Sequence, residues 1–217
     1  MNSRLQEKAK RMLDLTAAGV AMLLLCPLIG LVALAIWTRM GRPILFCHRR
    51  PGYAAKPFVL YKFRTMTDAF DTGGNLLPDP ERLTPLGSFL RRWSLDELPQ
   101  LWNVLKGDMS LVGPRPLLME YLEKYTPEQA RRHDVKPGLT GWAQLHGRQD
   151  LLFSKRLRMD VWYVEHQSFV LDLKVILLTL LNLHKLSAVG ASPDTGKTDD
   201  LGLFALIRKQ KSNPDRI

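Results

Sequence analysis

The sequence predicts an α-rich α+β protein with a membrane helix at its N-terminus, interfacial amphipathic helices and a small β-hairpin. The membrane and helical parts of this prediction rest on two observations. The run from Leu15 to Trp37 contains no charged residue, and helix-start signals recur along the remaining chain. The hairpin is predicted because two segments rich in strand-forming residues flank a Pro-Gly turn. Strands and helices do not alternate regularly, so a parallel α/β sheet is not expected.

Composition narrows the class of protein without naming a partner. The 217 residues suffice for one catalytic domain beside a membrane element. The formal net charge of +10 suits nucleic acid, anionic lipid or a phosphorylated substrate, and charge alone does not choose among them. There are 2 cysteines, Cys26 inside the apolar run and Cys47 beside basic residues, so neither a disulfide framework nor a thiolate metal site is expected.

The apolar run has two interpretations. As a straight helix it would be roughly 35 Å long, which is enough to cross a hydrocarbon core of about 30 Å. Pro27, however, lies near its middle and favours a kink. Both flanks are basic and no acidic residue occurs between Leu15 and Thr67, so both flanks suit the cytoplasmic side. A re-entrant hairpin bent at Pro27 and a simple span remain alternatives, because spanning helices tolerate proline.

The remaining chain is divided by its strand and loop signals. Residues 43–48 and 57–63 are expected to form the hairpin, and residues 68–80, rich in Gly, Pro and Asn, a loop. Residues 154–166 and 169–185 are expected to be helical, the latter as a core or interfacial helix. The expected domains are a membrane helix with basic flanks, a catalytic domain and a polar tail, at residues 1–40, 41–186 and 187–217.

Helix boundaries are marked by capping residues. Thr84, followed by proline, predicts a helix that runs to about residue 93. Ser94 and Glu97 match a capping box that would open a second helix ending near Gly107. Thr126, again followed by proline, predicts a third, short helix.

The adjacent acids Asp96 and Glu97 have a structural and a chemical interpretation. Acidic residues in a first helical turn complement the helix dipole, and this alone would account for them. Alternatively, an Asp ionised near its reference pKa of about 3.9 can attack phosphorus and form an acyl phosphate. A neighbouring Glu can hold a divalent metal ion through its hard oxygen ligands.

Basic residues around these acids are candidate anion holders. Single basic residues are usually solvated, but the contexts of Lys62 and Arg115 are more specific, and prolines on both sides stiffen the backbone at Arg115. Residues 136–148 suit a nucleotide pocket or an ordinary turn equally well. No HExxH, GxxxxGK[ST] or GxSxG motif occurs. The candidate phosphate-binding residues are Lys62, Arg64, Arg91, Arg115 and Arg148.

Taken together, these motifs resemble the bacterial sugar transferases, specifically the small monotopic polyprenyl-phosphate phosphoglycosyl transferases of the PglC type. The resemblance runs from residue 10 to about residue 180, most of the chain, and several blocks in the right order make it specific. The blocks are RPG at 50–52, KFRTM at 62–66, DELPQLWNVLKGDMS at 96–110, VGPRP at 112–116 and KPGLTGW at 136–142.

The resemblance implies a two-step reaction. Asp96 would attack the sugar-linked phosphorus of a UDP-sugar and release UMP, and a polyprenyl phosphate, usually undecaprenyl phosphate, would then take the phosphosugar. Glu97, with Asp96, would bind Mg²⁺. Lys62, Arg91 and Arg115 match basic positions near the phosphates, whereas Arg64 and Arg148 are added from their context.

The resemblance also implies a location and a set of partners. The N-terminal helix would be re-entrant, broken at Pro27, with the active site on the cytoplasmic face of the bacterial inner membrane. Membrane lipid is an expected partner, nucleic acid is not, and a homodimer is left open. Many relatives have Ser where this chain has Cys26, so a side-chain hydrogen bond that stabilises the bend is in doubt.

Two other classes of function are weighed against this one. A basic membrane-anchored nucleic-acid-binding or scaffold protein would depend on charge but not on Asp96. A nucleotide-sugar hydrolase would release sugar phosphate without a lipid acceptor. The sequence does not identify the sugar or the glycoconjugate, whether exopolysaccharide, O-antigen or glycoprotein.

Overall fold

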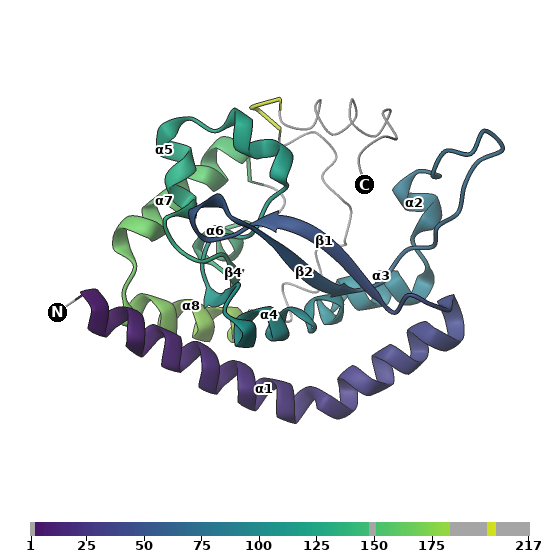
Figure 1. Ribbon diagram of the computed structural model, residues 1–217, viewed down its shortest axis with the longest axis horizontal. Coiled ribbons are helices and arrows are strands. Elements are labelled where there is room, and N and C mark those ends of the chain that lie inside the picture. The colour runs from purple at the N-terminus through teal and green to yellow at the C-terminus, as the bar shows by residue number, and fades with distance from the viewer. Residues whose placement is uncertain (1–2, 148–150, 183–198, 203–217) are drawn as a thin grey trace.

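The computed structural model describes residues 3–147, 151–182 and 199–202. Within these ranges the protein is rich in helix with two small sheets, as predicted (Figure 1). The helices are α1 (Ser3–Met40), α2 (Asp79–Arg82), α3 (Pro85–Arg92), α4 (Gln100–Lys106), α5 (Pro127–Ala130), α6 (Trp142–Leu145), α7 (Phe153–His166) and α8 (Phe169–Leu181). The strands are β1 (Leu45–Pro51), β2 (Pro57–Phe63), β3 (Ser110–Val112) and β4 (Gly138–Thr140). Short 3₁₀ turns complete the chain at η1 (Tyr53–Ala55), η2 (Leu95–Glu97), η3 (Met119–Lys124) and η4 (Arg131–His133).

Helix α1 runs along one side of the molecule, past α8, α4 and α3 (Figure 1). Its segment Leu5–Met40 is long and apolar enough to cross a membrane by length and composition, and only 11% of its most apolar window is buried. Apolar side chains such as Leu23 and Leu31 are exposed along it, a pattern typical of a helix that associates with a membrane. The helix is assigned as continuous through Pro27, and its ribbon curves near the middle in Figure 1.

Polar side chains fasten the N-terminal part of α1 to the rest of the protein. Lys10 Nζ lies 2.6 Å from Asp172 Oδ2 in α8. Asp14, buried, accepts hydrogen bonds from Ser110 Oγ at 3.0 Å and from the Leu111 amide at 2.9 Å. Buried polar groups need such partners, because a polar group left without a hydrogen bond in the interior is costly. These bonds therefore fix α1 against β3 and α8.

Apolar cores on the same side of α1 extend this contact along its length. One cluster joins α1 to β2 and α4, and a second joins its C-terminal half to β2 and α3. The buried members of the first are Ala18, Leu60, Leu101, Val104 and Met109. Those of the second are Val32, Ile36, Phe63 and Leu90.

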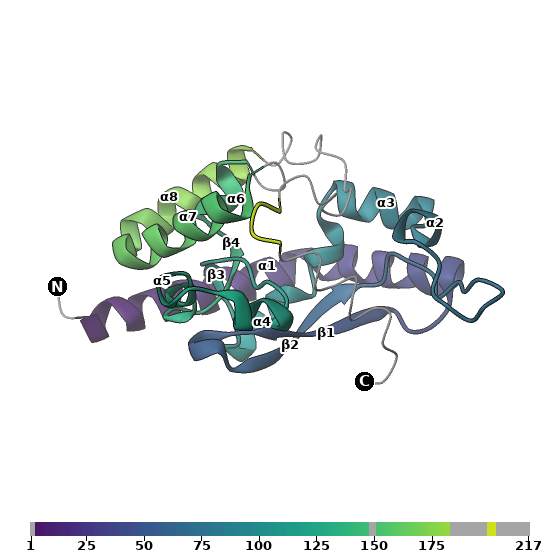
Figure 2. The same cartoon turned by 90° about the horizontal axis from the view of Figure 1, so that it is seen from above.

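The hairpin is confirmed, whereas the second sheet was not predicted. Strands β1 and β2 pair antiparallel from Leu45↔Phe63 to Pro51↔Pro57. Strands β3 and β4 pair in parallel through Ser110↔Gly138. Each has three residues, too few for an alternation of apolar and polar side chains to stand out in the sequence. In Figure 2 the hairpin lies along the lower edge of the molecule, and α6, α7 and α8 lie along the upper edge.

Most of the predicted helix signals are confirmed. Thr84 caps α3 by accepting from the Gly87 amide, and Thr126 forms a capping box with Gln129. Gly107 ends α4 with φ 95°, a left-handed conformation that glycine adopts without steric cost. Helices α7 and α8 match the predicted segments, although the predicted extension of α8 to residue 185 lies beyond the described residues.

The capping box predicted at Ser94 is wrong. Ser94 has a left-handed backbone (φ 55°, ψ 21°) and makes no side-chain cap, and residues 95–97 form a 3₁₀ turn. Helix α4 begins only at Gln100. Glu97 does not turn back to cap the helix, because its carboxylate binds Lys62 Nζ at 2.7 Å instead. A long-range ion pair has replaced the local hydrogen bond.

Because Gly87 has no side chain, α3 can approach the segment after β2 closely. A larger residue at this position should therefore destabilise the fold. A Cβ at this position would lie 1.9 Å from the Thr65 carbonyl oxygen, which is backbone and cannot yield easily. We expect Gly87→Ala to lower the free energy of unfolding by about 1–3 kcal/mol, the usual cost of overpacking. Gly30→Ala is the control, since a Cβ there meets nothing within 4 Å. Thermal denaturation of both variants in the same detergent checks this, and equal midpoints for the two would contradict it.

Candidate active site

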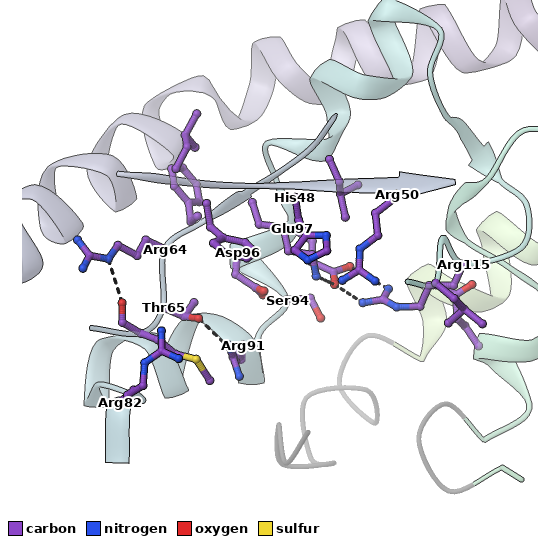
Figure 3. A pocket seen from close by; sticks show the side chains of 18 of the residues that line it. His48, Arg50, Arg64, Thr65, Arg82, Arg91, Ser94, Asp96, Glu97 and Arg115 are labelled. Carbon is purple, nitrogen blue, oxygen red and sulfur yellow. Dashed lines mark hydrogen bonds and ion pairs between the residues drawn. The ribbon is translucent and has the colours of Figure 1, made fainter. Parts of the chain in front are cut away.

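A pocket of about 500 Å³ opens beside the hairpin and the turn η2 (Figure 3). Its walls come from β1, β2, the segment after β2, α3, η2 and the loop after β3, so residues distant in the sequence meet there. Cationic side chains dominate its polar lining. The charged or titratable residues are His48, Arg50, Lys62, Arg64, Asp68, Arg82, Arg91, Asp96, Glu97, Arg115, Arg156 and Asp160.

Strand alternation explains why the hairpin supplies three of these groups. Successive side chains of a strand point to opposite faces, so His48 and Arg50 share one face of β1. Lys62 pairs with Phe46, which is on the same face, and therefore joins them. Burial and the charge of Arg50 lower the pKa of His48, so its imidazole is neutral at physiological pH.

The Glu97 carboxylate is held by two cations. Lys62 Nζ donates to Oε1 at 2.7 Å, and Arg115 donates through Nη2 to Oε1 at 2.5 Å and through Nη1 to Oε2 at 3.3 Å. Burial raises the pKa of this carboxyl, but Arg115 and Lys62 outweigh burial and hold the pKa well below its usual range. Glu97 is therefore ionised throughout the physiological pH range.

The neighbouring Asp96 has the opposite environment. Its side chain belongs to a residue only 8% exposed, and its carboxylate accepts no hydrogen bond from the described residues. Burial, followed by the charge of Glu97, raises the pKa of Asp96 to about 6, with Lys62, Arg91 and Arg115 opposing the rise. The expectation of an ordinary pKa near 3.9 is thus wrong, because η2 is buried rather than an exposed helix start.

Two further predicted cations lie on one side of Asp96 in Figure 3. Arg91 Nε donates to Thr65 Oγ1 at 2.9 Å. Arg64 Nη2 donates to Asp68 Oδ2 at 2.6 Å. Both side chains line the pocket, so the structure brings four predicted cations, Lys62 and Arg115 included, to Asp96 and Glu97. Arg148, the fifth, lies outside the described residues.

Sequence reasoning missed three cations that also line the pocket, Arg50, Arg82 and Arg156. Arg50 could have been found, because it lies in the RPG block and its position in the hairpin puts it on the same face as Lys62. Arg82 and Arg156 belong to α2 and α7, whose placement beside the hairpin depends on tertiary contacts. No sequence signal that we used reports such contacts.

The two adjacent carboxylates also bear on metal binding. Among the described residues no group of three or more His, Cys, Asp or Glu side chains could hold a metal ion. Mg²⁺ does not require such a group, because it commonly binds one or two carboxylates and completes its shell with water and substrate phosphate. Asp96 and Glu97 are hard oxygen donors in one short turn, and they fit this mode.

A buried carboxylate that is free of hydrogen bonds and surrounded by cations can bind a polyanion and attack phosphorus. Together with the exposed apolar face of α1, this site is the kind expected in a membrane-associated enzyme that acts on a phosphorylated ligand. A model of the bacterial sugar transferase family matches residues 5–185. The chain belongs to that family.

Relatives of known name agree with this assignment. The chain is 56% identical over 171 residues to the uncharacterized sugar transferase EpsL of Bacillus subtilis (strain 168), covering 79% of this chain and 85% of that protein. It is 44% identical over 190 residues to the undecaprenyl-phosphate glucose phosphotransferase of Komagataeibacter xylinus, covering 79% and 35%. It is 40% identical over 183 residues to the UDP-glucose:undecaprenyl-phosphate glucose-1-phosphate transferase of Escherichia coli (strain K12), covering 79% and 39%. The chain thus spans most of EpsL and less than half of the two longer relatives.

The environment of Asp96 predicts a titration near neutral pH. With a pKa of about 6, Asp96 is mostly protonated at pH 5 and, by roughly ten to one, ionised at pH 7. A reaction that needs the carboxylate should therefore become faster as the pH rises through 6. Glu97→Gln should lower the pKa of Asp96, because it removes a neighbouring negative charge and releases two cations.

Infrared difference spectroscopy of the Asp96 carboxyl, with Asp96→Asn as the blank, measures this pKa directly. Lys106→Met is the control for Glu97→Gln, because Lys106 pairs with Asp108 and does not line the pocket. It should leave the pKa of Asp96 unchanged. An Asp96 carboxyl that titrates near pH 4 in the unmodified protein would contradict the burial argument.

Proposed function

We propose that this protein transfers a phosphosugar from a UDP-sugar to a polyprenyl phosphate, usually undecaprenyl phosphate, through an aspartyl-phosphosugar intermediate. This would be the first membrane step in the synthesis of a bacterial glycoconjugate. The observation that carries the proposal is the pair of carboxylates in the pocket: Glu97 is bound by two cations, and Asp96 accepts no hydrogen bond from the described residues. The names of the relatives, which include UDP-glucose and undecaprenyl phosphate, support both substrate classes.

In the first step an Asp96 oxygen attacks the sugar-linked phosphorus. A carboxylate–phosphorus bond forms, the bond between the two phosphates breaks, and UMP leaves with the bonding electrons. In the second step a phosphate oxygen of the acceptor attacks the same phosphorus and releases the Asp96 carboxylate. Charge and atoms balance in both steps without a proton transfer, so the site needs no general base beside Asp96.

The cations of the pocket would stabilise the negative charges of the substrate phosphates and of Glu97. Arg91 and Arg115 are directed at a site where phosphate charge develops, and their guanidinium groups stay protonated there. Lys62 and Arg115 keep Glu97 ionised and in place. Glu97, with Asp96, would hold Mg²⁺, which when bound offsets phosphate charge and makes UMP a better leaving group.

The contacts of α1 support a re-entrant rather than a spanning path. Lys10 and Asp14 bind β3 and α8, while Ile36 packs in a core with Leu90 of α3. The two ends of α1 are thus fastened to the same domain, which a helix crossing the bilayer between them would not allow. We therefore propose that α1 enters the membrane and returns near Pro27, with the active site on the cytoplasmic face of the inner membrane.

An apolar groove supports the lipid nature of the acceptor. It has a volume of about 380 Å³ and is formed by α1, the hairpin and the start of α4. Met22 and Ile29, on either side of Pro27, form one wall, and Trp102 forms another. Leu45 and Phe63 line both this groove and the catalytic pocket. The groove therefore leads from α1 to the phosphate site, as the isoprenoid chain of a polyprenyl phosphate requires.

The nucleophile is tested by UMP release from a panel of UDP-sugars with undecaprenyl phosphate and Mg²⁺. We expect Asp96→Asn to abolish UMP release, because an amide cannot form the acyl phosphate. Chelation of the metal should also suppress UMP release if Mg²⁺ takes part. Turnover retained by Asp96→Asn would refute the nucleophile, and steady release of sugar phosphate without lipid would identify a hydrolase. Nucleic-acid binding that is unaffected by the substitution, without turnover, would favour the scaffold alternative.

The groove is tested by the chain length of the acceptor. We expect Trp102→Ala to raise the KM for undecaprenyl phosphate on the order of tenfold, because apolar contact with the chain is lost. A short-chain acceptor should be affected less, and UMP release before acceptor is added should not change. Trp93→Ala is the matched control, since Trp93 is 51% exposed, Trp102 is 55% exposed, and only Trp102 lines the groove. If Trp93→Ala and Trp102→Ala raised the KM for undecaprenyl phosphate equally, the isoprenoid chain would not bind in this groove.

A further inference from the structure

Arg50 differs from four other arginines of the catalytic pocket, each of which donates a hydrogen bond to a described residue: Arg64, Arg82, Arg91 and Arg115. Its Nε is buried and has no hydrogen-bond partner. No ion pair of Arg50 with a described residue is present, although Glu120 is near enough to influence its pKa. In contrast, Arg91 binds Thr65 and Arg115 binds Glu97. Arg50 is thus a largely buried cation with no partner in the described part of the chain.

The charge around Arg50 indicates an anion. Burial and the neighbouring Arg115 lower the pKa of Arg50 to about 10, so the guanidinium is still charged at neutral pH. Arg50, Lys62 and Arg115 all line the pocket, and Lys62 and Arg115, but not Arg50, bind the Glu97 carboxylate. Burying a cation that has no hydrogen-bonded partner is unfavourable, and a phosphate between Arg50 and Arg115 would supply that partner.

The position of Arg50 relative to Asp96 suggests which phosphate. In Figure 3, Asp96 lies between Arg64 and Arg91 on one side and Arg50 and Arg115 on the other. Phosphoryl transfer proceeds with the attacking and leaving oxygens roughly in line. When Asp96 attacks, UMP must leave opposite to it, and the acceptor must later attack from that vacated position. The phosphate of the departing UMP and the phosphate of the incoming acceptor must therefore occupy the same position, one after the other.

We propose that Arg50, together with Arg115, forms one phosphate subsite that is used twice in each turnover. The phosphate of departing UMP occupies it first, and the phosphate of the polyprenyl acceptor occupies it afterwards. The inference rests on the proposed two-step function and adds to it a residue and an order of occupancy. UMP gains one negative charge as the bond to the second phosphate breaks, and the acceptor arrives as a dianion. The charge of Arg50, which has no hydrogen-bonded partner among the described residues, favours both states.

The test separates the two half-reactions. Adduct formation is followed as a single burst of UMP without acceptor, and transfer is followed by adding polyprenyl phosphate to the isolated adduct. We expect Arg50→Ala to slow both steps on the order of 10- to 100-fold, the usual effect of losing a charge-assisted hydrogen bond. UMP should also inhibit the transfer step competitively with the acceptor, and more weakly in Arg50→Ala. Arg50→Lys should be intermediate, because lysine keeps the charge but not the planar fork.

Arg49 provides the matched control. It is the preceding residue of β1, carries the same side chain, is exposed and points to the opposite face of the hairpin. Arg49→Ala should leave both half-reactions unchanged. Arg50→Ala should not lower the thermal midpoint, because it removes an unpaired buried charge, so a loss of rate would not reflect unfolding.

Three outcomes would overturn the inference. Unchanged rates in Arg50→Ala would show that the subsite is elsewhere. A loss confined to adduct formation would make Arg50 a nucleotide contact that the acceptor does not share. If the unmodified protein forms no adduct on Asp96, the proposed function itself fails, and that result is distinguishable because it does not depend on Arg50.

Discussion

The ion pairs of Glu97 with Lys62 and Arg115 are the interaction on which the rest of the site depends. Two adjacent carboxylates in a buried turn cannot both be ionised at low cost, because each disfavours the charge of the other. The cations decide the competition in favour of Glu97, which they bind directly. Asp96 is left with the burial penalty and the negative neighbour, and its pKa rises to about 6.

This division of roles suits covalent catalysis. A carboxylate that is neither bound by a cation nor hydrogen-bonded keeps its lone pairs available for attack, and one with a raised pKa is a stronger nucleophile than an ordinary aspartate. Ser94 contributes through its backbone, since its left-handed conformation turns the chain into η2. Such a conformation is unfavourable for a non-glycine residue and is found preferentially at functional sites.

The sequence predicts well those features whose cause is local. The threonine caps of α3 and α5, the glycine that ends α4 and the hairpin depend on neighbouring residues, and all are confirmed. The capping box at Ser94 is wrong because Glu97 has partners 35 and 18 residues away, which local reasoning does not weigh. The ordinary pKa expected for Asp96 is wrong because the folded chain buries this carboxyl, which local reasoning does not weigh either. Site residues on α2 and α7 also depend on contacts that only the folded chain reveals.

The arrangement also explains how one pocket can serve two very different substrates. A UDP-sugar is soluble, whereas a polyprenyl phosphate stays in the bilayer, yet what they present to the protein is a phosphate. In the proposed reaction Arg50 and Arg115 would recognise that shared group, and the groove lined by Met22 and Ile29 would accommodate the part that differs. Because the hairpin follows α1 directly, the strand that carries Arg50 begins where α1 ends. Arg50 is therefore carried by the same continuous segment as the apolar helix, and the contacts of α1 with the rest of the protein also constrain the position of this cation.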